Sequence, residues 1–503
     1  MQCNAWSHIV QLRLSKNSFG SSFSCRKESS YDFALVLFCW RHGWFATLCE
    51  MVNQMIIIIY SDTNASSIEA NLGLPEYSYY FVLKEFRPVL EQLGIVVAVN
   101  SPSHEVDVIY RNALMHGESC VFLSFSPPHK TIVDLACPTI PVFAWEFSTL
   151  PTEVWFGEPR HDWRYVFGKL GSAITHSAFT ADTVLQSMAL DFPVASIPAP
   201  VWDRFAALRG KLAISNNPNG VELNVAGTVI DSRSVDLSPY SPERRKLPKP
   251  NLVRPPAIAS NEPLKVHLDG VVYTSVFNPY DGRKNWYDMI SAFCWAFRET
   301  EDATLVLKLT HHDPRIGIDN LLENIFKLTP FKCRILLIHG YLGDLDYENL
   351  VSATTYVLNT SHGEGQCLPL MEFMSCGKPA VAPRNTAMAD YIDDDNAFVL
   401  DSSTEPSCWP HDPRRAYRTL RYRIDWGTLL EAYQESYRVA KQEPAKYAQM
   451  AEHAVSRLQR HCSRAVVKER LQTFLARHPG IADYRSSSAA ASEQIDREKV
   501  QAC

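Results

Sequence analysis

The chain lacks the features that would assign it to a membrane-spanning, secreted or nucleic-acid-binding class. No apolar run reaches the ~18–20 residues of a membrane-spanning helix, and the nearest candidate, Phe33 to Leu48, is interrupted by Arg41 and His42. The first residues show no basic segment followed by an apolar stretch and a small-residue cleavage site, so no signal peptide is expected. The 49 Lys and Arg do not exceed the 55 Asp and Glu, which argues against nucleic acid as a partner.

Cysteine pairs and low-complexity composition are missing too. The 13 cysteines are an odd number and include no Cys-x-x-Cys pair, so a reducing, cytoplasmic compartment is favoured over a secreted disulfide framework. With 21 glycines and 31 prolines among 503 residues, collagen-like and low-complexity classes are excluded. A hydrophobic share of 46% excludes a wholly disordered chain and suits a soluble enzyme.

Residues 1–54 differ from the rest of the chain. They hold four cysteines and a serine-rich stretch without sustained periodicity. The β-branched run Met55–Tyr60 then fits a buried parallel strand that opens a domain. We interpret residues 1–54 as a poorly structured extension, with Met51 or Met55 as the true start. The alternative is a small packed pair of helices.

Strands alternate with helices over 55–204 and again over 265–478, which predicts two α/β domains, each with a parallel sheet. After Trp426 the pattern becomes helical. The further strands expected in the two domains are Ile95–Val99, Cys120–Phe125, Pro141–Trp145, Ala173–Thr175, Val194–Ile197, Val271–Val276, Thr304–Leu309, Ile335–Ile338, Thr355–Asn359 and Ala380–Ala382.

Residues 205–264 break this alternation. Seven prolines lie between Pro239 and Pro263 among basic residues, which indicates a proline-stiffened linker or surface insertion. Its basic cluster is either a solvated face or a contact with anionic lipid, so a position peripheral to the membrane stays open. Residues 479–503 are rich in Ser and Ala and are expected to be disordered.

The segment from Asn359 to Ala382 carries the strongest chemical pattern. A strand ends, a glycine-flanked loop follows, and a helix opens with Pro369 in its first turn, where a missing N–H does no harm. Glu364 precedes this helix and Glu372 lies about one turn inside it, at the strand ends where open α/β sheets bind ligands. The alternative is an acidic, well-capped helix start that binds nothing. The backbone N–H groups that would point out of the helix, as in anion sites, are those of Gln366, Cys367 and Leu368.

This segment resembles the glutamate-x7-glutamate motif of retaining GT-B glycosyltransferases, specifically glycosyltransferase family 4. Glu364 and Glu372 have the spacing of that motif, and the Gly-x-x-x-Pro-Leu-x-Glu run and the Cys-Gly-Lys-Pro-Ala-Val-Ala ending also match. The resemblance implies a GT-B fold, with two Rossmann-like domains facing across a cleft and C-terminal helices. It also implies that Glu372 binds ribose hydroxyls, that Glu364 binds a donor-sugar hydroxyl, and that the amides of Gly365 to Leu368 orient sugar or phosphate.

A second match is the segment Tyr273–Trp286, which is similar to the first strand and diphosphate loop of the family's C-terminal domain. Lys284 matches the family's lysine and, with Arg283, would stabilise charge on a departing diphosphate. The family's arginine stands nearer the position of Asn278. Lys308, inside an otherwise apolar strand, is a further phosphate candidate. The alternative is a helix-opening loop with exposed basic residues.

The loop Pro141–Pro151 is similar to the place where many relatives carry an acceptor-side histidine. Trp145 and Glu146 stand there instead. Glu146 could orient the acceptor hydroxyl or sugar. The alternative is a buried, hydrogen-bonded carboxylate at a strand end.

Three further clusters carry weaker signals. Asp344-Leu345-Asp346 fits a metal-binding DxD pattern, but it precedes a predicted helix, where acidic residues favour the N-terminus. His311-His312-Asp313 lacks a partner pattern for a metal. Arg414, Arg418 and Arg421 would share one helical face, either solvated or phosphate-binding.

Together these matches imply an enzyme that moves a sugar from a nucleotide-sugar donor to a glycan, lipid-linked or other acceptor. The resemblance implies retention of anomeric configuration, with no metal or other cofactor. Two alternatives remain. One is a catalytically inactive GT-B scaffold that partners another transferase, and the other is a different GT-B sugar-nucleotide enzyme, such as an epimerase or phosphorylase.

Removing residues 1–50 is expected to leave a stable and active protein, because Met55–Tyr60 already supplies the opening strand. The check compares the thermal midpoint and donor turnover of a protein that starts at Met51 with those of the full chain. A large drop in either would show that the extension is structural, since burying Phe33 to Leu48 could contribute several kcal/mol at ~25 cal/mol per Å².

Overall fold

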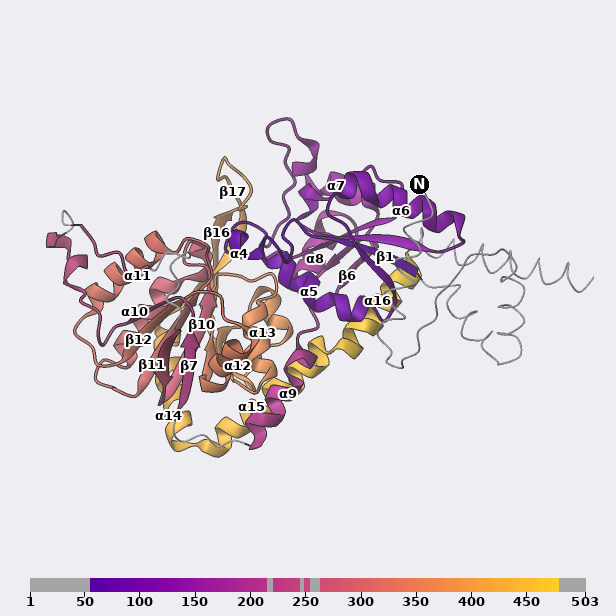
Figure 1. Ribbon diagram of the computed structural model, residues 1–503. Helices are drawn as coiled ribbons and strands as arrows, with labels where there is room; N and C mark the ends of the chain where they lie inside the picture. Colours follow the sequence, from indigo (N-terminus) through magenta and orange to yellow (C-terminus); the bar gives the residue numbers. More distant parts are fainter. Residues whose placement is uncertain (1–54, 215–219, 245–247, 254–262, 479–503) are drawn as a thin grey trace, which may run out of the picture. The chain divides into compact units, whose positions relative to one another are not determined.

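The computed structural model describes residues 55–214, 220–244, 248–253 and 263–478. The predictions for residues 1–54 and 479–503 fall outside the described residues. Two mainly parallel sheets, each with its own helices, make up the architecture (Figure 1). No helix within the described ranges is long and apolar enough to cross a membrane.

The first sheet contains six parallel strands in the order β2-β1-β3-β4-β5-β6. The chain therefore leaves β1 toward β2 on one side and later continues from β3 toward the other side. This reversal defines a topological switch point between β1 and β3. The strands are β1 (Met55–Tyr60), β2 (Gly94–Ala98), β3 (Cys120–Phe125), β4 (Thr139–Phe143), β5 (Ala173–Thr175) and β6 (Val194–Ser196).

Alternation along β1 explains how both faces of this sheet are covered. Ile57 and Ile59 join the large hydrophobic core, whereas Ile58 joins a second cluster with Val106 of α6 and Phe122 of β3. A strand that is buried on both faces has a continuous apolar sequence. The apolar run Met55–Tyr60 predicted such a strand, and the structure confirms it. The helices of this domain are α4 (Ile68–Asn71), α5 (Ser78–Leu90), α6 (Pro102–Met115), α7 (Trp163–Leu170) and α8 (Ala178–Ser187).

The second sheet has the order β15-β14-β13-β10-β11-β12-β8, with β8 antiparallel at one edge. Leaving β8 aside, this is the strand order of the Rossmann fold, and its switch point lies between β10 and β13. The strands are β8 (Thr228–Asp231), β10 (Val271–Phe277), β11 (Ala303–Leu309), β12 (Arg334–His339), β13 (Tyr356–Leu358), β14 (Ala380–Pro383) and β15 (Ala397–Leu400). Its helices are α10 (Trp286–Ala296), α11 (Arg315–Leu328), α12 (Asp344–Ala353) and α13 (Leu368–Ser375). α9 (Ala206–Ile214) lies in the connection from the first domain to the second and contacts α12 and α13 there.

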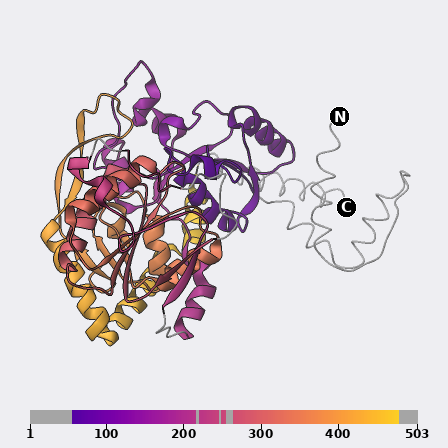
Figure 2. The ribbon, with the colours of Figure 1, turned by 60° about the vertical axis from the view of Figure 1, so that its left-hand side comes forward.

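A hairpin and three helices complete the described chain (Figure 1 and Figure 2). They are β16 (Ser402–Cys408), β17 (Tyr417–Ile424), α14 (Trp426–Gln442), α15 (Pro444–Cys462) and α16 (Arg464–Arg477). α14 packs against α10 of the second domain, whereas α16 packs against α5 of the first. The predicted fold class, two Rossmann-like α/β domains with C-terminal helices, is confirmed by this topology.

The structure differs from the sequence prediction in two segments. Within 205–264, where a linker was predicted, β8 extends the second sheet, and β7 (Val221–Val225) pairs with β9 (Leu264–Leu268). These strands are short and their partners are distant in sequence, so no local periodicity predicts them. The helical face predicted for the Arg414–Arg423 segment is wrong, because residues 417–424 form β17, paired with β16.

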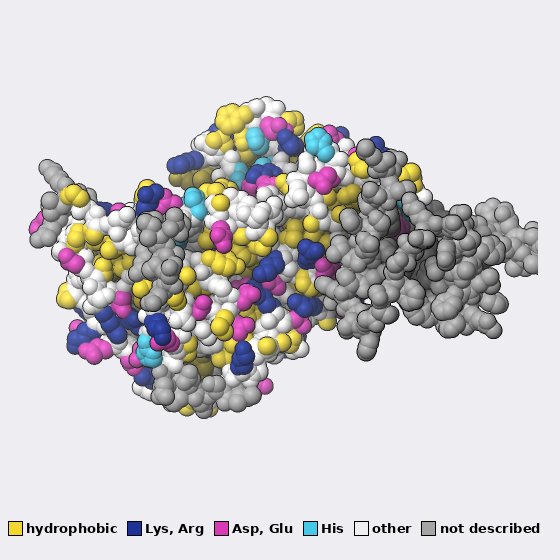
Figure 3. Space-filling model, in the orientation of Figure 1, with side chains coloured by type: hydrophobic (Ala, Val, Ile, Leu, Met, Phe, Trp, Pro, Cys, Tyr) yellow, Lys and Arg dark blue, Asp and Glu magenta, His cyan; other side chains and the backbone are white. Residues whose placement is uncertain are grey.

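Charged side chains of both signs are interspersed over the face seen in Figure 3. This mixture agrees with the small net charge of −6.

Candidate active site

Two loops meet at the switch point of the second sheet. β10 is followed by the short helix η7 (Gly282–Lys284), and β13 is followed by the loop that leads into α13. The two strands are parallel neighbours, so their carboxyl ends lie at the same edge. The loops bring Arg283 and Lys284 against Glu364.

Glu364 is buried and its carboxylate is held by several donors. Its Oε1 accepts hydrogen bonds from Lys284 Nζ at 2.6 Å and from Ser361 Oγ at 2.6 Å. Asn359 Nδ2 donates to the same oxygen at 3.1 Å. Burial opposes ionisation, but the charges of Lys284 and Arg283 outweigh it and hold the pKa of Glu364 at about 2. Glu364 is therefore a carboxylate at any physiological pH.

Arg283 connects four acceptors. Its guanidinium donates to the backbone oxygen of Gly363 at 2.5 Å and to Asp281 at 2.9 Å. It also lies 3.1 Å from Glu146 Oε1 and 3.4 Å from Glu364 Oε2. Burial lowers its pKa, but the surrounding carboxylates more than compensate and raise it.

The ion pair between Arg283 and Glu146 joins the two domains, because Glu146 follows β4 of the first sheet. Burial raises the pKa of Glu146, and Arg283 partly offsets that effect. The sequence prediction placed Glu146 on the acceptor side, and the structure brings it into the same cluster as Arg283 and Lys284.

Trp145 lies in the core rather than in this cluster. Its side chain is only 2% exposed, and its ring centroid lies 4.6 Å from that of Trp163. The indole Nε1 donates to the backbone oxygen of Thr149 at 3.0 Å. Trp145 thereby anchors the loop that carries Glu146.

The start of α13 passes close to the first domain. A Cβ added at Gly365 would lie 2.7 Å from Ala144 Cβ, so this position requires glycine. Gln366 Oε1 accepts a backbone N–H of the first domain at 2.9 Å, and its Nε2 is buried without a partner in the described part of the chain. Cys367 adopts a φ of 62° as the N-cap, and Leu368 is the first residue of α13.

Glu372 lies in a different environment from Glu364. Its Oε1 is 3.4 Å from Arg204 Nη1, and its Oε2 accepts a hydrogen bond from the Tyr347 hydroxyl. Arg204 also pairs with Glu85 and Asp344, both at 3.2 Å. Burial raises the pKa of Glu372 to about 7, and the charge of Arg204 offsets only part of that rise.

Lys308 stands apart from both glutamates. Its Nζ donates to the backbone oxygen of Leu309 at 3.2 Å, and the structure pairs it with no carboxylate among the described residues. Burial lowers its pKa to about 8. The structure thus gives Lys308 no contact with Arg283, Lys284 or Glu364.

Several residues of the site were not anticipated. Asn359, Ser361 and Asp281 lie inside the two segments that the motifs mark. Their polar side chains could therefore have been predicted as hydrogen-bond partners of Glu364 and Arg283. Arg204 and Tyr347 reach Glu372 from distant elements, and no local pattern marks them.

The weaker clusters have ordinary structural roles. Asp344 and Asp346 lie in the first turn of α12, as the helix N-terminus reading predicted. His311 Nδ1 contacts the backbone of Asp313. Arg414 and Arg418 both pair with Glu153, at 2.8 and 2.5 Å.

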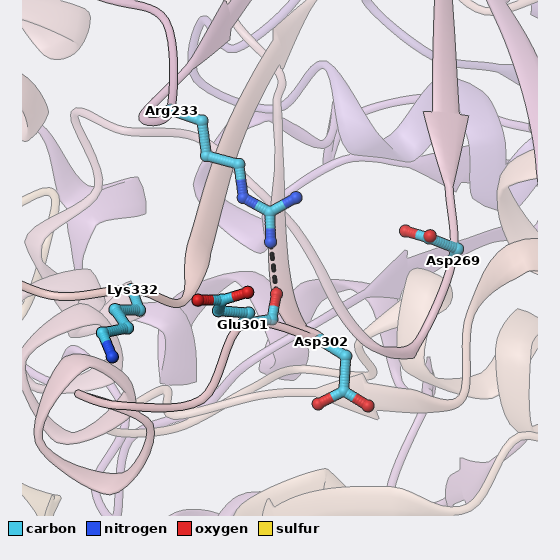
Figure 4. Close-up of a pocket in the computed structure, with 5 residues that line it drawn as sticks. All are labelled: Arg233, Asp269, Glu301, Asp302 and Lys332. Carbon is cyan, nitrogen blue, oxygen red and sulfur yellow. Dashed lines mark hydrogen bonds between the residues drawn. The ribbon is translucent and has the colours of Figure 1, made fainter.

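A pocket in the second domain lies away from this site. It is found at the amino ends of the sheet, since several of its residues directly precede β10, β11 and β12, and Arg233 donates to the backbone oxygen of Glu301 (Figure 4). Ligands of open α/β sheets bind at the opposite, carboxyl edge, so we do not place the active site here. Its lining residues are Arg233, Asp269, Glu301, Asp302 and Lys332.

No protein-family model and no curated protein matches the chain. It is similar to the solved structure of Alr3699/HepE from Anabaena in complex with UDP and glucose, with 12% identity and a TM-score of 0.46 over 84% of this chain and 100% of that one. It is also similar to a glycosyltransferase from Rickettsia africae, with 11% identity and a TM-score of 0.47 over 84% and 98% of the two chains. Sucrose-phosphate synthase from Thermosynechococcus elongatus shows 13% identity and a TM-score of 0.47 over 87% and 100%.

Because the pKa of Glu372 is raised in the folded chain, this side chain makes a contribution to the free energy of unfolding that falls as pH rises. The folded carboxyl holds its proton up to about pH 7, whereas the unfolded one loses it near the ordinary pKa of a glutamate, 4.5. Its contribution is therefore full below about pH 4.5 and is lost as pH rises toward 7. Because glutamine does not titrate, Glu372→Gln should gain ~1–3 kcal/mol relative to the unsubstituted chain between pH 4.5 and pH 8.

Urea unfolding of both proteins at several pH values measures this difference. Glu431→Gln, at an exposed position on α14, is the matched control. A difference between Glu372→Gln and the unsubstituted chain that stays constant with pH would contradict the assignment.

Proposed function

We propose that the chain is a glycosyltransferase that moves a sugar from a nucleotide-sugar donor to a saccharide or lipid-linked acceptor. The observation that carries this proposal is the half-buried pair Arg283 and Lys284, held against Glu364 at the switch point of the second sheet. Open α/β sheets bind ligands at that point. Adjacent cationic side chains are the groups that recognise a diphosphate.

Donor binding would exchange the partners of these cations. In the structure, Arg283 is paired with Glu146 and Lys284 with Glu364. A diphosphate would take over both cations, and Glu364 would then accept a hydrogen bond from a hydroxyl of the donor sugar. Because Glu146 belongs to the first domain, the diphosphate and the contact between the domains would compete for Arg283.

The same cations would act during sugar transfer. Negative charge on the leaving diphosphate grows as its bond to the anomeric carbon breaks, so fixed cations stabilise the transition state more than the bound donor. Arg283 and Lys284 would supply the positive charge that a divalent ion supplies in other phosphate sites. Sugar transfer would therefore require no metal or other cofactor.

Glu372 would bind the ribose of the donor. Its carboxylate lies inside α13, is buried, and already accepts a hydroxyl hydrogen bond from Tyr347. Ribose hydroxyls are donors of the same kind. The amides from Gly365 to Leu368, at the start of the same helix, would orient the sugar or phosphate.

Retention of anomeric configuration rests on the resemblance to glycosyltransferase family 4. The bond between the anomeric carbon and the diphosphate oxygen would break, and the acceptor oxygen would form its bond on the same face. The acceptor proton would pass to the departing phosphate, with Glu146 orienting the acceptor hydroxyl. We propose a cytoplasmic reaction, peripheral to the membrane where the acceptor is lipid-linked.

An inactive scaffold is the second candidate, favoured by one observation. The ion pair between Arg283 and Glu146 links the two domains and would also serve a protein that only holds a partner. A scaffold needs these charges for stability alone, whereas a transferase needs Lys284 for turnover.

Lys284→Ala is expected to lower kcat by about 10²–10³, the usual loss when one charge-stabilising donor is removed. Donor affinity should change less, because the cation acts mainly in the transition state. A panel of nucleotide-sugars, screened by release of nucleoside diphosphate, supplies the donor, and steady-state kinetics then separate kcat from KM.

Lys332→Ala is the control, since that lysine is 54% exposed and lies at the opposite edge of the sheet. If Lys284→Ala lowered only the thermal midpoint, or raised KM with kcat unchanged, the catalytic role would be refuted. Absence of donor turnover across the whole panel would favour the scaffold.

A further inference from the structure

A group of metal-ligating side chains lies at the switch point of the first sheet. Glu76 precedes α5, and His129 lies in η1 (Pro128–Lys130), directly after β3. His411 comes from the loop that joins β16 to β17. Ligand atoms of these three residues lie within 4.8 Å of one another. The group therefore stands at the carboxyl edge of β1 and β3, where the strand order reverses and where such sheets bind ligands.

The two imidazoles lie next to each other. Their ring centroids are 4.7 Å apart, and Nδ1 of His129 is buried without a hydrogen-bond partner in the described ranges. Imidazole nitrogen is the commonest metal ligand in proteins. An unpartnered ring nitrogen next to a second imidazole is therefore a preformed half of a metal site.

The local charges permit a cation. Glu76 forms a close ion pair with Lys130 through Oε2, and Lys130 also lies 3.1 Å from Asp62. Two carboxylates thus share one ammonium group. A carboxylate has a second oxygen, so Glu76 can hold Lys130 and a metal together, at some cost from the nearby ammonium charge.

We infer that Glu76, His129 and His411 form a binding site for a transition-metal ion of the Zn²⁺ class. Two imidazole nitrogens and one carboxylate oxygen are a ligand set that zinc takes in open sites, with water or another oxygen in the fourth position. Imidazole ligands favour Zn²⁺, Cu²⁺ and Ni²⁺ over Mg²⁺ and Ca²⁺. Tetrahedral zinc would draw the ligand atoms to about 3.3 Å from one another, a side-chain movement of roughly 1 Å.

This metal would fasten the hairpin to the first domain. Glu76 and His129 belong to the first domain, whereas His411 is carried by the hairpin that follows β15. Direct contacts already join the two, because Trp409 Nε1 donates to the Thr149 backbone oxygen at 3.2 Å, and Thr149 Oγ1 donates to the Arg418 backbone oxygen at 2.8 Å. The site shares no residue with the Glu364 cluster.

Zinc titration of the full chain, stripped with a chelator, tests the inference by calorimetry and by thermal midpoint. Since 13 cysteines can also bind zinc, the readout is the difference between variants. The unsubstituted chain should bind one equivalent more than His129→Asn or His411→Asn, and it should gain several degrees in thermal midpoint that these two variants do not gain. His104→Asn, an exposed position on α6, is the matched control and should behave like the unsubstituted chain.

Cobalt provides a second readout that does not depend on the histidine variants folding. Co²⁺ bound by nitrogen and oxygen absorbs in the visible range without the strong near-ultraviolet thiolate band of a cysteine site. Glu76→Gln should weaken that visible band. Equal zinc stoichiometry in the unsubstituted chain, His129→Asn and His411→Asn would overturn the inference, as would a cobalt spectrum of thiolate type alone.

Discussion

The pairing of the half-buried Arg283 and Lys284 with carboxylates at the switch point of the second sheet constrains the rest of the site. Taking charges out of water is costly unless they are paired and hydrogen-bonded. Here Glu364, Asp281 and Glu146 supply the pairing, and Asn359 and Ser361 satisfy the carboxylate. One of these partners comes from the first domain, so neutralising the cations also couples the two domains.

The two glutamates of the sequence motif show how environment separates residues of one chemical type. Glu364 has cations within hydrogen-bond distance and stays ionised, with a pKa of about 2. Glu372 is buried with Arg204 more distant, and its pKa is about 7. The spacing of the two glutamates in the sequence does not predict this difference in pKa. It arises because Glu364 contacts the charged Lys284, whereas Glu372 contacts the neutral hydroxyl of Tyr347.

The sequence predicted those parts of the structure that depend on local pattern. β3, β5 and the start of α13 at Leu368 follow from apolar runs and from Pro369, and they form as expected. The pairing of Lys284 with Glu364 was also within reach, because both follow strands of one sheet. β8, β17 and the contacts of Arg204 could not be predicted, since they depend on partners far away in the chain. The placement of Trp145 in the core depends on Trp163, whose position no motif reveals.

A crystal structure of the full chain with a bound nucleoside diphosphate would show whether Arg283 and Lys284 bind the donor. Phosphate oxygens are expected within hydrogen-bond distance of Lys284 Nζ, with Arg283 no longer paired to Glu146. A diphosphate bound elsewhere, with the ion pairs of Arg283 and Lys284 unchanged, would contradict donor binding by these cations.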